Sequence, residues 1–207
     1  HGLIDLLYQE NQKFNLTGLK SKPLMYDKHV LDSQQISRYI HAEHARAKRI
    51  LDMGTGAGFP GLIIAMEHPD KEVVLIDSSR KKTNFINQAV SFLDIQNVTV
   101  VCDRIESFSA VRHRDFDLVM ARALARIDIL MEYAAPYLDF GGFLLAMKSE
   151  DIGHELLIAQ NIQDFLGFIS HNPVPYRFSD YLRYILPFQK TTQPELHLPR
   201  RVGLATK

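Results

Sequence analysis

The sequence predicts an α/β fold in which helices cover both faces of a mostly parallel sheet. From about residue 50 onward, short apolar runs typical of buried strands alternate with longer segments of helical spacing. A glycine-rich stretch, residues 50–61, joins the first of these runs to a helix. The chain has 207 residues, of which 46% are hydrophobic and 23% charged, so we expect one globular domain with a short extension.

The N-terminal segment is predicted to be helical. Leucine and isoleucine residues within 2–11 recur at spacings compatible with one helical face. A turn is expected over residues 13–18, after which Pro23 starts another short helix. The next helix is expected to run to about Ile40. Residues 41–49, rich in His, Arg and Lys, then lead to the glycine-rich stretch.

The remaining segments alternate between strand and helix. Beyond the glycine-rich stretch, strands are predicted over residues 73–76, 98–101, 116–120, 142–147, 167–174 and 182–188. Helices are predicted to start at Pro60 and to cover 81–93, 127–135 and 151–165. We therefore divide the chain into a helical extension over 1–45, a central domain over 46–190 and a basic tail over 191–207. The extension is expected to lack its start, because His1 already lies within a helical pattern.

Composition excludes several classes of protein. The single Cys102 excludes an intrachain disulfide and fits a reducing compartment, so we expect a cytoplasmic protein. No apolar run is long enough to span a bilayer, and no secretory signal is visible. His and Cys residues do not show zinc-ligand spacing, so no metal is expected. A formal net charge of zero argues against non-specific coating of nucleic acid but allows local basic patches. We expect a monomer.

The glycine-rich stretch is the strongest functional signal. Gly54, Gly56, Gly58 and Gly61 form a loop with few side chains, which lets a ligand approach the backbone closely. Gly56-x-Gly58-x-x-Gly61 matches the dinucleotide fingerprint, which alone is weak evidence. Asp52, at the tip of the preceding strand, would repel a pyrophosphate but suits a cation such as a sulfonium. The stretch therefore favours S-adenosylmethionine over NAD, although a tight turn without a ligand is the simpler alternative.

Polar residues follow the next two predicted strands, where ligands bind in an open α/β sheet. Asp77 and Ser78 follow the second strand, and an acid there can accept hydrogen bonds from the ribose hydroxyls of either NAD or S-adenosylmethionine. Asp77 could equally cap the following helix. Ile105 and Glu106 come after the third strand, where the adenine edge would lie. A lone acid after a strand is weak evidence.

Basic residues follow the fourth and fifth predicted strands. Arg122 could lie over a cofactor or point at a substrate, but a surface salt bridge is about as plausible. Lys148 is expected at the rim of the same cleft. His29 and Asp32 would ordinarily be surface or capping residues of their helix. The sequence contains neither a Gly-x-Ser-x-Gly elbow nor a P-loop, so no other catalytic constellation competes.

Taken together, these motifs resemble those of the bacterial ribosomal small-subunit methyltransferase G family, also called glucose-inhibited division protein B. The glycine motif alone is shared by many methyltransferases, whereas the ordered set is far more specific. The resemblance runs from about Phe14 to Lys148, and more loosely through the Pro199-Arg200-Arg201 tail. It is carried by Asn15-Leu16-Thr17, His29-Val30-Leu31-Asp32-Ser33, Asp52 to Gly61, Leu75-Ile76-Asp77-Ser78, Arg104-Ile105-Glu106 and Arg122-Ala123.

The resemblance implies an S-adenosylmethionine-dependent enzyme that methylates N7 of one guanine in small-subunit (16S) ribosomal RNA. It implies a class I methyltransferase domain, placed here over 46–190, with a Rossmann-like sheet of seven strands whose last strand is antiparallel. Two departures are the family's usual proline at the position of Ala57 and its longer N-terminal helical region.

The resemblance also implies roles for individual residues. Gly54 and Phe59 would contact the methionine part of the cofactor, with Asp52, Gly56 and Gly58 in the same loop. Asp77 and Ser78 would take the ribose, and Ile105 and Glu106 would flank the adenine. Arg122 would lie beside both cofactor and target. The remaining residues, expected at the rim of the site or in contact with the RNA, are His29, Asp32, Arg200 and Arg201.

The mechanism expected from this target is alignment. Guanine N7 has a free lone pair at neutral pH and therefore needs no general base. Arg122 and Lys148 are the candidates to donate to the guanine edge. Basic clusters could hold phosphates, within free RNA or an assembled ribosomal particle, although each alone is more often a solvated face; they are Lys20/Lys22/Lys28, Arg46/Lys48/Arg49 and Arg200/Arg201.

Three other functions remain open on the residues alone. The cofactor motifs also fit a methyltransferase that acts on a small molecule or a protein. The glycine fingerprint fits a dinucleotide-binding Rossmann protein or dehydrogenase. A non-catalytic ribosome-binding protein is the third alternative.

Overall fold

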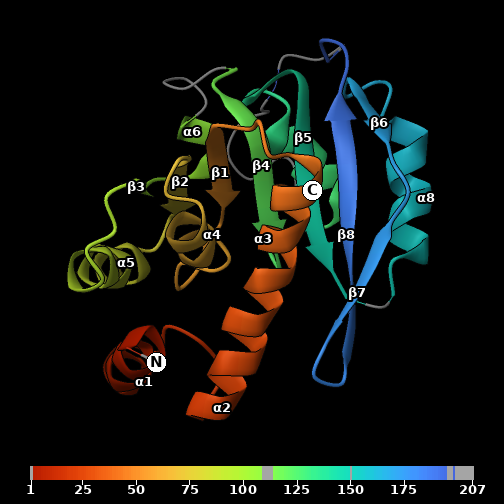
Figure 1. Ribbon diagram of the computed structural model, residues 1–207. Helices are drawn as coiled ribbons and strands as arrows, with labels where there is room; N and C mark the ends of the chain where they lie inside the picture. The colour runs from red at the N-terminus through yellow and green to blue at the C-terminus, as the bar shows by residue number, and fades with distance from the viewer. Residues whose placement is uncertain (1, 109–113, 150, 195–197, 199–207) are drawn as a thin grey trace.

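A central sheet organises the computed structural model, which describes residues 2–108, 114–149, 151–194 and 198 (Figure 1). Within these residues the sheet has eight strands, in the order β3-β2-β1-β4-β5-β8-β6, with β7 paired to the outer part of β8. The strands are β1 Arg49–Met53, β2 Glu72–Asp77, β3 Val98–Cys102, β4 Phe116–Arg122, β5 Leu138–Lys148, β6 Phe168–Ser170, β7 Val174–Phe178 and β8 Tyr181–Lys190.

Helices cover both faces of the sheet. One buried cluster packs β1, β2 and β4 against the N-terminal helices and the helices that follow β1 and β2. These are α1 Gly2–Phe14, α2 Lys22–Met25, the π-helix η1 Tyr26–Leu31, α3 Asp32–Glu43, α4 Gly61–Glu67 and α5 Arg80–Phe92. The cluster on the other face includes α6 Ile105–Phe108, α7 Ile127–Ala134 and α8 Gly153–Ile162.

Alternation along the buried strands explains the two clusters. Ile50 belongs to the first cluster and Leu51, the next residue of β1, to the second. Both are fully buried, as expected where successive side chains point to opposite faces of a sheet covered on both sides. The continuous apolar runs in the sequence are therefore strands of a parallel sheet, as predicted.

The carboxyl ends of the parallel strands meet at one edge of the sheet. β1 pairs in parallel with β2 on one side and with β4 on the other, so the direction in which the strands are added reverses beside β1. In Figure 1 the arrowheads of β1, β4 and β5 point down, whereas β8, which is antiparallel to β5, points up. A reversal of strand order at the carboxyl ends is where open α/β sheets bind ligands.

The predicted fold class is confirmed, and the sheet has one strand more than the seven expected. The single strand predicted over 167–174 is wrong, because β6 ends at Ser170 and β7 begins at Val174. Pro173, which lacks an N–H donor, lies in the break. Helix α6 was not predicted, because four residues are too few to show a helical period.

The N-terminal helices form a long rod beside the sheet. α2, η1 and α3 follow one another without a break, and the π-helical turn lies in the middle (Figure 1). π-Helical turns occur mostly as short interruptions of α-helices, often at functional sites. In the part of the chain that the structure describes, no helix is long and apolar enough to cross a membrane.

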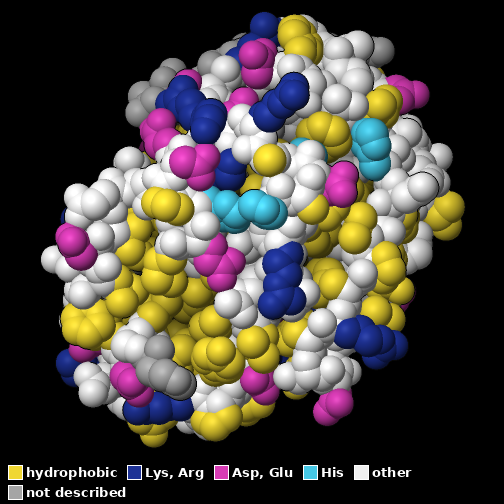
Figure 2. Space-filling model, viewed as in Figure 1, with side chains coloured by type: hydrophobic (Ala, Val, Ile, Leu, Met, Phe, Trp, Pro, Cys, Tyr) yellow, Lys and Arg dark blue, Asp and Glu magenta, His cyan; other side chains and the backbone are white. Residues whose placement is uncertain are grey.

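Several large apolar side chains near the N-terminus are exposed. They include Phe14 of α1, Leu24 of α2 and Phe92 of α5, with 47%, 43% and 61% of their surface accessible. Figure 2 shows apolar side chains gathered over this part of the molecule.

Candidate functional site

The loop between β1 and α4 depends on its glycines. Gly54, Gly56 and Gly58 have φ angles of 63°, 64° and 90°, in the left-handed region that side chains disfavour. A Cβ atom added at Gly54 or Gly58 would crowd Leu124 or Leu62, whereas one at Gly56 would meet nothing within 4 Å. The backbone at Gly56 is therefore open to the close approach of a ligand.

Asp52, at the end of β1, is fully buried beneath this loop. Its Oδ2 atom accepts hydrogen bonds from Thr55 Oγ1 at 2.7 Å and from the Gly61 backbone N–H at 2.9 Å. Its Oδ1 atom has no partner among the described residues. The carboxyl group thus holds the two ends of the glycine loop together. Burial raises its pKa to about 6, against the lowering effect of these hydrogen bonds.

The pKa of Asp52 predicts how stability depends on pH. The folded-state pKa, about 6, exceeds the model-compound value of 3.8, so between these values the folded state retains a proton that the unfolded state loses. Rising pH therefore destabilises the wild type by about 3 kcal/mol through this group, at about 1.4 kcal/mol per pKa unit. We expect Asp52→Asn to lack this loss.

Thermal or denaturant unfolding between about pH 4 and about pH 7 checks this expectation. The difference in unfolding free energy, variant minus wild type, should rise with pH, while contributions from other titrating groups cancel. A difference that stays constant across this range would show that Asp52 ionises without penalty.

A cavity of about 320 Å³ lies beside the glycine loop at the carboxyl ends of β2 and β3. Gly54, Asp77, Ser78, Ile105 and Glu106 all line it, so these five predicted cofactor residues converge in space. Leu124 and Tyr133 form further walls. The cavity combines an apolar surface with carboxylate acceptors, which suits the ribose and adenine of a nucleoside.

Asp77 connects this cavity to the loop. Its Oδ2 atom accepts a hydrogen bond from the Gly56 N–H at 3.0 Å, and its Oδ1 atom accepts one from the Ser79 N–H at 2.8 Å. Each carboxylate oxygen can accept a further bond. Asp77 therefore orients the residue before α5 while presenting acceptors to the cavity, but the N-cap of α5 is Ser79, so the alternative that Asp77 caps this helix is wrong.

Arg122, at the end of β4, joins the sheet to the N-terminal helices. Its Nη1 atom donates to Asp32 Oδ2 at 2.9 Å and to the Lys28 carbonyl at 2.8 Å. Asp32 is 1% exposed, and its Oδ1 atom accepts from the Tyr176 hydroxyl at 2.7 Å. Burial and the Asp32 carboxylate raise the pKa of Tyr176, which stays protonated. Asp32, expected at the rim, therefore faces protein partners through both oxygens.

His29 occupies the space between Arg122 and the glycine loop. Arg122 Nη2 donates to His29 Nδ1 at 3.0 Å, so the other ring nitrogen carries the hydrogen and faces Thr17 Oγ1 at 3.2 Å. The imidazole stacks on Phe59, with centroids 4.6 Å apart. Burial and the charge of Arg122 lower the His29 pKa to about 3. His29 is therefore neutral at physiological pH, and both of its nitrogens have partners.

Lys148 is held by a second ion pair at the end of β5. Its Nζ atom donates to Glu155 Oε2 at 2.6 Å and to the Ala125 carbonyl at 2.7 Å. The same Glu155 oxygen accepts from the Ile127 N–H at the start of α7, at 3.0 Å. This lysine, expected to face the guanine, therefore contacts the first turn of α8 and the segment that connects β4 to α7.

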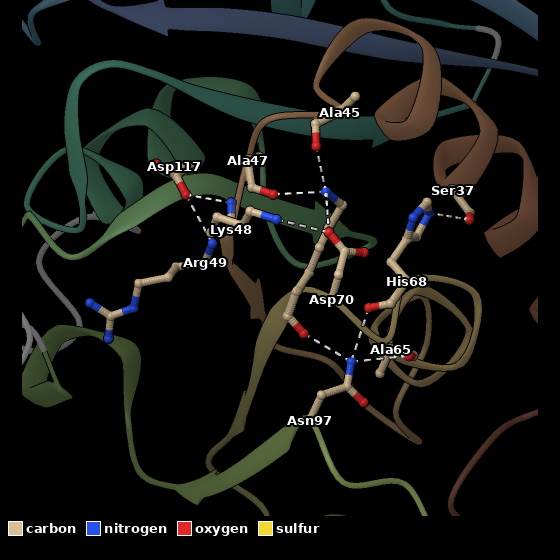
Figure 3. A network of polar contacts seen from close by, with 11 residues as sticks. Ser37, Ala45, Ala47, Lys48, Arg49, Ala65, His68, Asp70, Asn97 and Asp117 are labelled. Atoms are coloured by element: carbon tan, nitrogen blue, oxygen red, sulfur yellow. Dashed lines mark hydrogen bonds and ion pairs between the residues drawn. The ribbon is translucent and has the colours of Figure 1, made fainter.

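The basic cluster at residues 46–49 lies far from the cavity, because β1 begins at Arg49 and the cavity lies beyond its other end. Figure 3 shows this region, where Lys48 Nζ pairs with Asp70 at 3.0 Å and Asp117 accepts from the Lys48 and Arg49 backbone N–H groups. These contacts fix strand starts. Arg200 and Arg201, expected to bind RNA, lie outside the described residues.

The structure thus brings most of the predicted site residues to one edge of the sheet. In the described part of the chain, no group of three or more His, Cys, Asp or Glu side chains could hold a metal ion. Sequence reasoning missed Tyr176, which lies 144 positions from Asp32 and carries no local motif. It also missed Leu124 and Tyr133, which are ordinary apolar positions in the sequence.

Comparisons with known proteins agree with this geometry. A family model described as rRNA small subunit methyltransferase G matches residues 1–174. A protein named ribosomal RNA small subunit methyltransferase G from Syntrophomonas wolfei is 34% identical over 205 residues, covering 98% of this chain and 94% of that protein. A protein of the same name from Caldicellulosiruptor bescii is 35% identical over 211 residues, covering 99% and 88%.

Solved structures show the same fold. The crystal structure of a SAM-dependent methyltransferase from Aquifex aeolicus superimposes with a TM-score of 0.61 at 17% identity, covering 81% of this chain and 93% of that one. At this identity the likeness concerns the fold, which is that of class I methyltransferases.

Proposed function

The chain belongs to the ribosomal RNA small subunit methyltransferase G family, and from this premise we propose that its cleft beyond β1, β2 and β4 methylates N7 of a guanine in 16S ribosomal RNA. The methyl donor is S-adenosylmethionine. One observation carries the assignment of the site: the Asp77 carboxylate shares a cavity with Ile105 and Glu106, directly beside a loop of glycines.

The residues of the cavity fit the donor. Asp77 would accept from the ribose hydroxyls, and Ile105 and Glu106 would contact the adenine as an apolar wall and an acceptor. Gly54 to Phe59 would hold the methionine part, where the backbone at Gly56 is open. When bound, the donor supplies an electrophilic methyl group on a sulfonium. Asp52, buried under the loop, contributes by fixing the loop.

The charges near the cavity distinguish this donor from a dinucleotide. Asp77, Asp103 and Glu106 line the cavity together with Lys82 and Arg104. Lys82 Nζ lies 3.7 Å from Asp77 Oδ2 and is partly neutralised by it. A pyrophosphate at the glycine loop would face the Asp77 carboxylate, which already accepts the Gly56 N–H that a phosphate would need. This arrangement favours a ligand without phosphate.

Transfer to guanine N7 asks the protein for alignment rather than for proton removal. The ring nitrogen has a free lone pair, so the acceptor is already nucleophilic. His29, whose imidazole stacks on Phe59 at the glycine loop, has both nitrogens occupied and is a very weak base. We assign a positioning role to His29, Asp32 and Arg122. They hold η1 at a fixed position relative to the glycine loop, so that the donor and the guanine meet at one place.

Arg122 and Lys148 have different roles in the proposed mechanism. Arg122 remains the candidate beside donor and target, because it ends β4 at the switch point of the sheet. Lys148 acts through Glu155, by fixing the start of α7.

We further propose that an assembled small subunit is the substrate and that the enzyme acts as a monomer in the cytoplasm. We also propose that the helical extension, the methyltransferase domain and the basic tail are its three parts.

Methyl transfer to purified small subunits tests the proposal. Subunits isolated from cells that lack this protein are incubated with the enzyme and S-adenosylmethionine labelled in the methyl group, and the RNA is digested to nucleosides. The expected result is label in 7-methylguanosine alone. Label in another nucleoside, in ribosomal protein, or in neither would reject the assignment and favour a methyltransferase of another substrate class.

A further inference from the structure

The hairpin formed by β7 and β8 extends beyond the carboxyl edge of the sheet. Tyr184 of β8 pairs with Lys148, the last residue of β5, so residues 181–183 lie beyond that strand. β7 pairs with residues 181–185 of β8, of which Tyr184 and Ile185 also pair with β5, and it was not expected from the sequence. In Figure 1 the hairpin projects below the arrowheads, on the same side as η1.

Where the hairpin meets η1, two cations are held against aromatic rings: Lys28, from η1, and Arg183, from β8. Lys28 Nζ lies 4.7 Å from the centroid of the Tyr181 ring, and the Arg183 guanidinium carbon lies 5.9 Å from that of Phe178. Phe178 and Tyr181 pair across the hairpin, with ring centroids 5.3 Å apart. Cation–π contacts of this kind orient a basic side chain without neutralising its charge.

Within the described ranges of the chain, neither cation has an acidic partner. Among the described residues, Lys28 and Arg183 form no ion pair, and Asp180 at the hairpin turn does not reach either of them. Arg122 and Lys148, by contrast, are both paired with carboxylates. Figure 2 shows basic side chains over this part of the surface. The N–H donors of the two cations therefore remain available to an external anion.

Both residues are linked to Arg122, Lys28 through its own backbone carbonyl and Arg183 through Tyr176 and Asp32. The Lys28 carbonyl accepts from Arg122 Nη1 at 2.8 Å. Arg183 is paired in register with Tyr176, whose hydroxyl donates to Asp32, the partner of Arg122. An anion held by these two side chains would consequently lie on the side of the cleft where Arg122 and Asp32 join η1 to the hairpin.

We propose that Lys28 and Arg183 bind backbone phosphates of the ribosomal RNA next to the target guanine, with Tyr181 and Phe178 as the rings that fix the two cations. The proposal rests on the proposed function, because it takes the RNA as substrate. Unpaired basic groups at a fixed position beside a cleft are the residues that set the register of a nucleic acid through its phosphates. An acidic protein surface would meet the same charges and is an outcome of the test.

Neutral variants that keep the apolar stem provide the test. Lys28→Met and Arg183→Met preserve contact with the rings, and Arg46→Met, at the opposite end of β1 and exposed, is the matched control. Binding of unmethylated small subunits is measured at several salt concentrations with S-adenosylhomocysteine present. Lys28→Met and Arg183→Met should each bind about three- to tenfold more weakly, and the slope of log affinity against log salt should fall by about one. The control should match the wild type within about twofold.

Two results would overturn the proposal. The first is that Lys28→Met and Arg183→Met show the same affinity and salt slope as Arg46→Met. The second is that ultraviolet crosslinking joins residues 177–184 to a ribosomal protein instead of RNA. Thermal unfolding and titration with S-adenosylhomocysteine, both expected to be unchanged, separate lost RNA binding from damage to the fold. Failure of the proposed function would look different, because the wild type itself would then form no 7-methylguanosine.

Discussion

Replacing Arg122 by alanine is expected to abolish methyl transfer and to destabilise the protein together. The substitution leaves the Asp32 carboxylate, 1% exposed, with the Tyr176 hydroxyl as its only hydrogen-bond partner among the described residues. Breaking a buried ion pair on one side costs about 3–5 kcal/mol of unfolding free energy. His29 and the Lys28 carbonyl lose the same donor, so the helical rod is no longer fixed against the sheet. We expect kcat to fall by at least about 100-fold.

Tyr176→Phe is the matched control for this prediction. It removes one hydroxyl from Asp32 but leaves the pair with Arg122 intact, so stability should fall by about 1–2 kcal/mol. If Arg122 orients the site, Tyr176→Phe should lower kcat by less than Arg122→Ala while the affinity for S-adenosylhomocysteine stays unchanged. Retention of full methyl transfer by a folded Arg122→Ala protein would remove Arg122 from the site and would favour a non-catalytic role on the ribosome.

Replacing Asp77 by alanine is expected to lower the affinity for S-adenosylhomocysteine by about 100-fold. In the proposed site this carboxylate accepts two hydrogen bonds from the ribose, and hydrogen bonds to a charged group contribute about 1.5–3 kcal/mol each. The Gly56 N–H also loses its acceptor, which loosens the loop that faces the donor. Isothermal titration gives the affinity directly, and the loss corresponds to about 3 kcal/mol.

Asp70→Ala controls for the loss of an acidic residue in general. Asp70 is exposed and pairs with Lys48 at the opposite end of β1, so the affinity for S-adenosylhomocysteine should not change. Equal affinity in Asp77→Ala and Asp70→Ala would mean that the ribose lies elsewhere. Binding of NADH by the wild type in place of S-adenosylhomocysteine would support the dinucleotide alternative.

The part of the site that could be predicted from sequence is the part that depends on strand ends. Asp77, Ile105 and Glu106 each follow an apolar run, and parallel strands bring their carboxyl ends to one edge. The local sequence is enough to predict these residues, because a residue at the end of a parallel strand lies at the carboxyl edge of the sheet whatever the rest of the chain does. The glycine loop could also be predicted from local sequence, because each position with a positive φ angle favours glycine independently of its neighbours.

The part that could not be predicted depends on partners far apart in the chain. Asp32 meets Tyr176 across 144 positions, on a strand that the sequence does not separate from its neighbour. Lys148 was expected to face a substrate because it lies at the end of a strand, yet it forms an ion pair with Glu155 in α8. A basic residue at the carboxyl edge of a sheet is therefore a candidate site residue. Whether it faces a ligand depends on whether the tertiary fold places a carboxylate close enough to pair with it.

The same distinction applies to basic clusters. Lys48 immediately precedes β1 and Arg49 begins it, so the direction of the strand places them at the edge opposite the cavity, where they pair with Asp70 and Asp115. Lys28 belongs to a similar run of lysines in the sequence, but the π-helical turn and the hairpin bring it beside Arg122. Strand polarity, once assigned, would have separated the two clusters without a structure.

The central claim is that this cleft aligns a sulfonium donor with a ring nitrogen that needs no deprotonation. Single-turnover methyl transfer to small subunits, measured from about pH 7 to about pH 8.5, tests it most directly, because the Asp52 pKa of about 6 lies below this range. The account predicts a rate that stays constant within about twofold. A rate that rises about tenfold per pH unit would require a proton to leave the acceptor first, and would contradict transfer to guanine N7 by alignment alone.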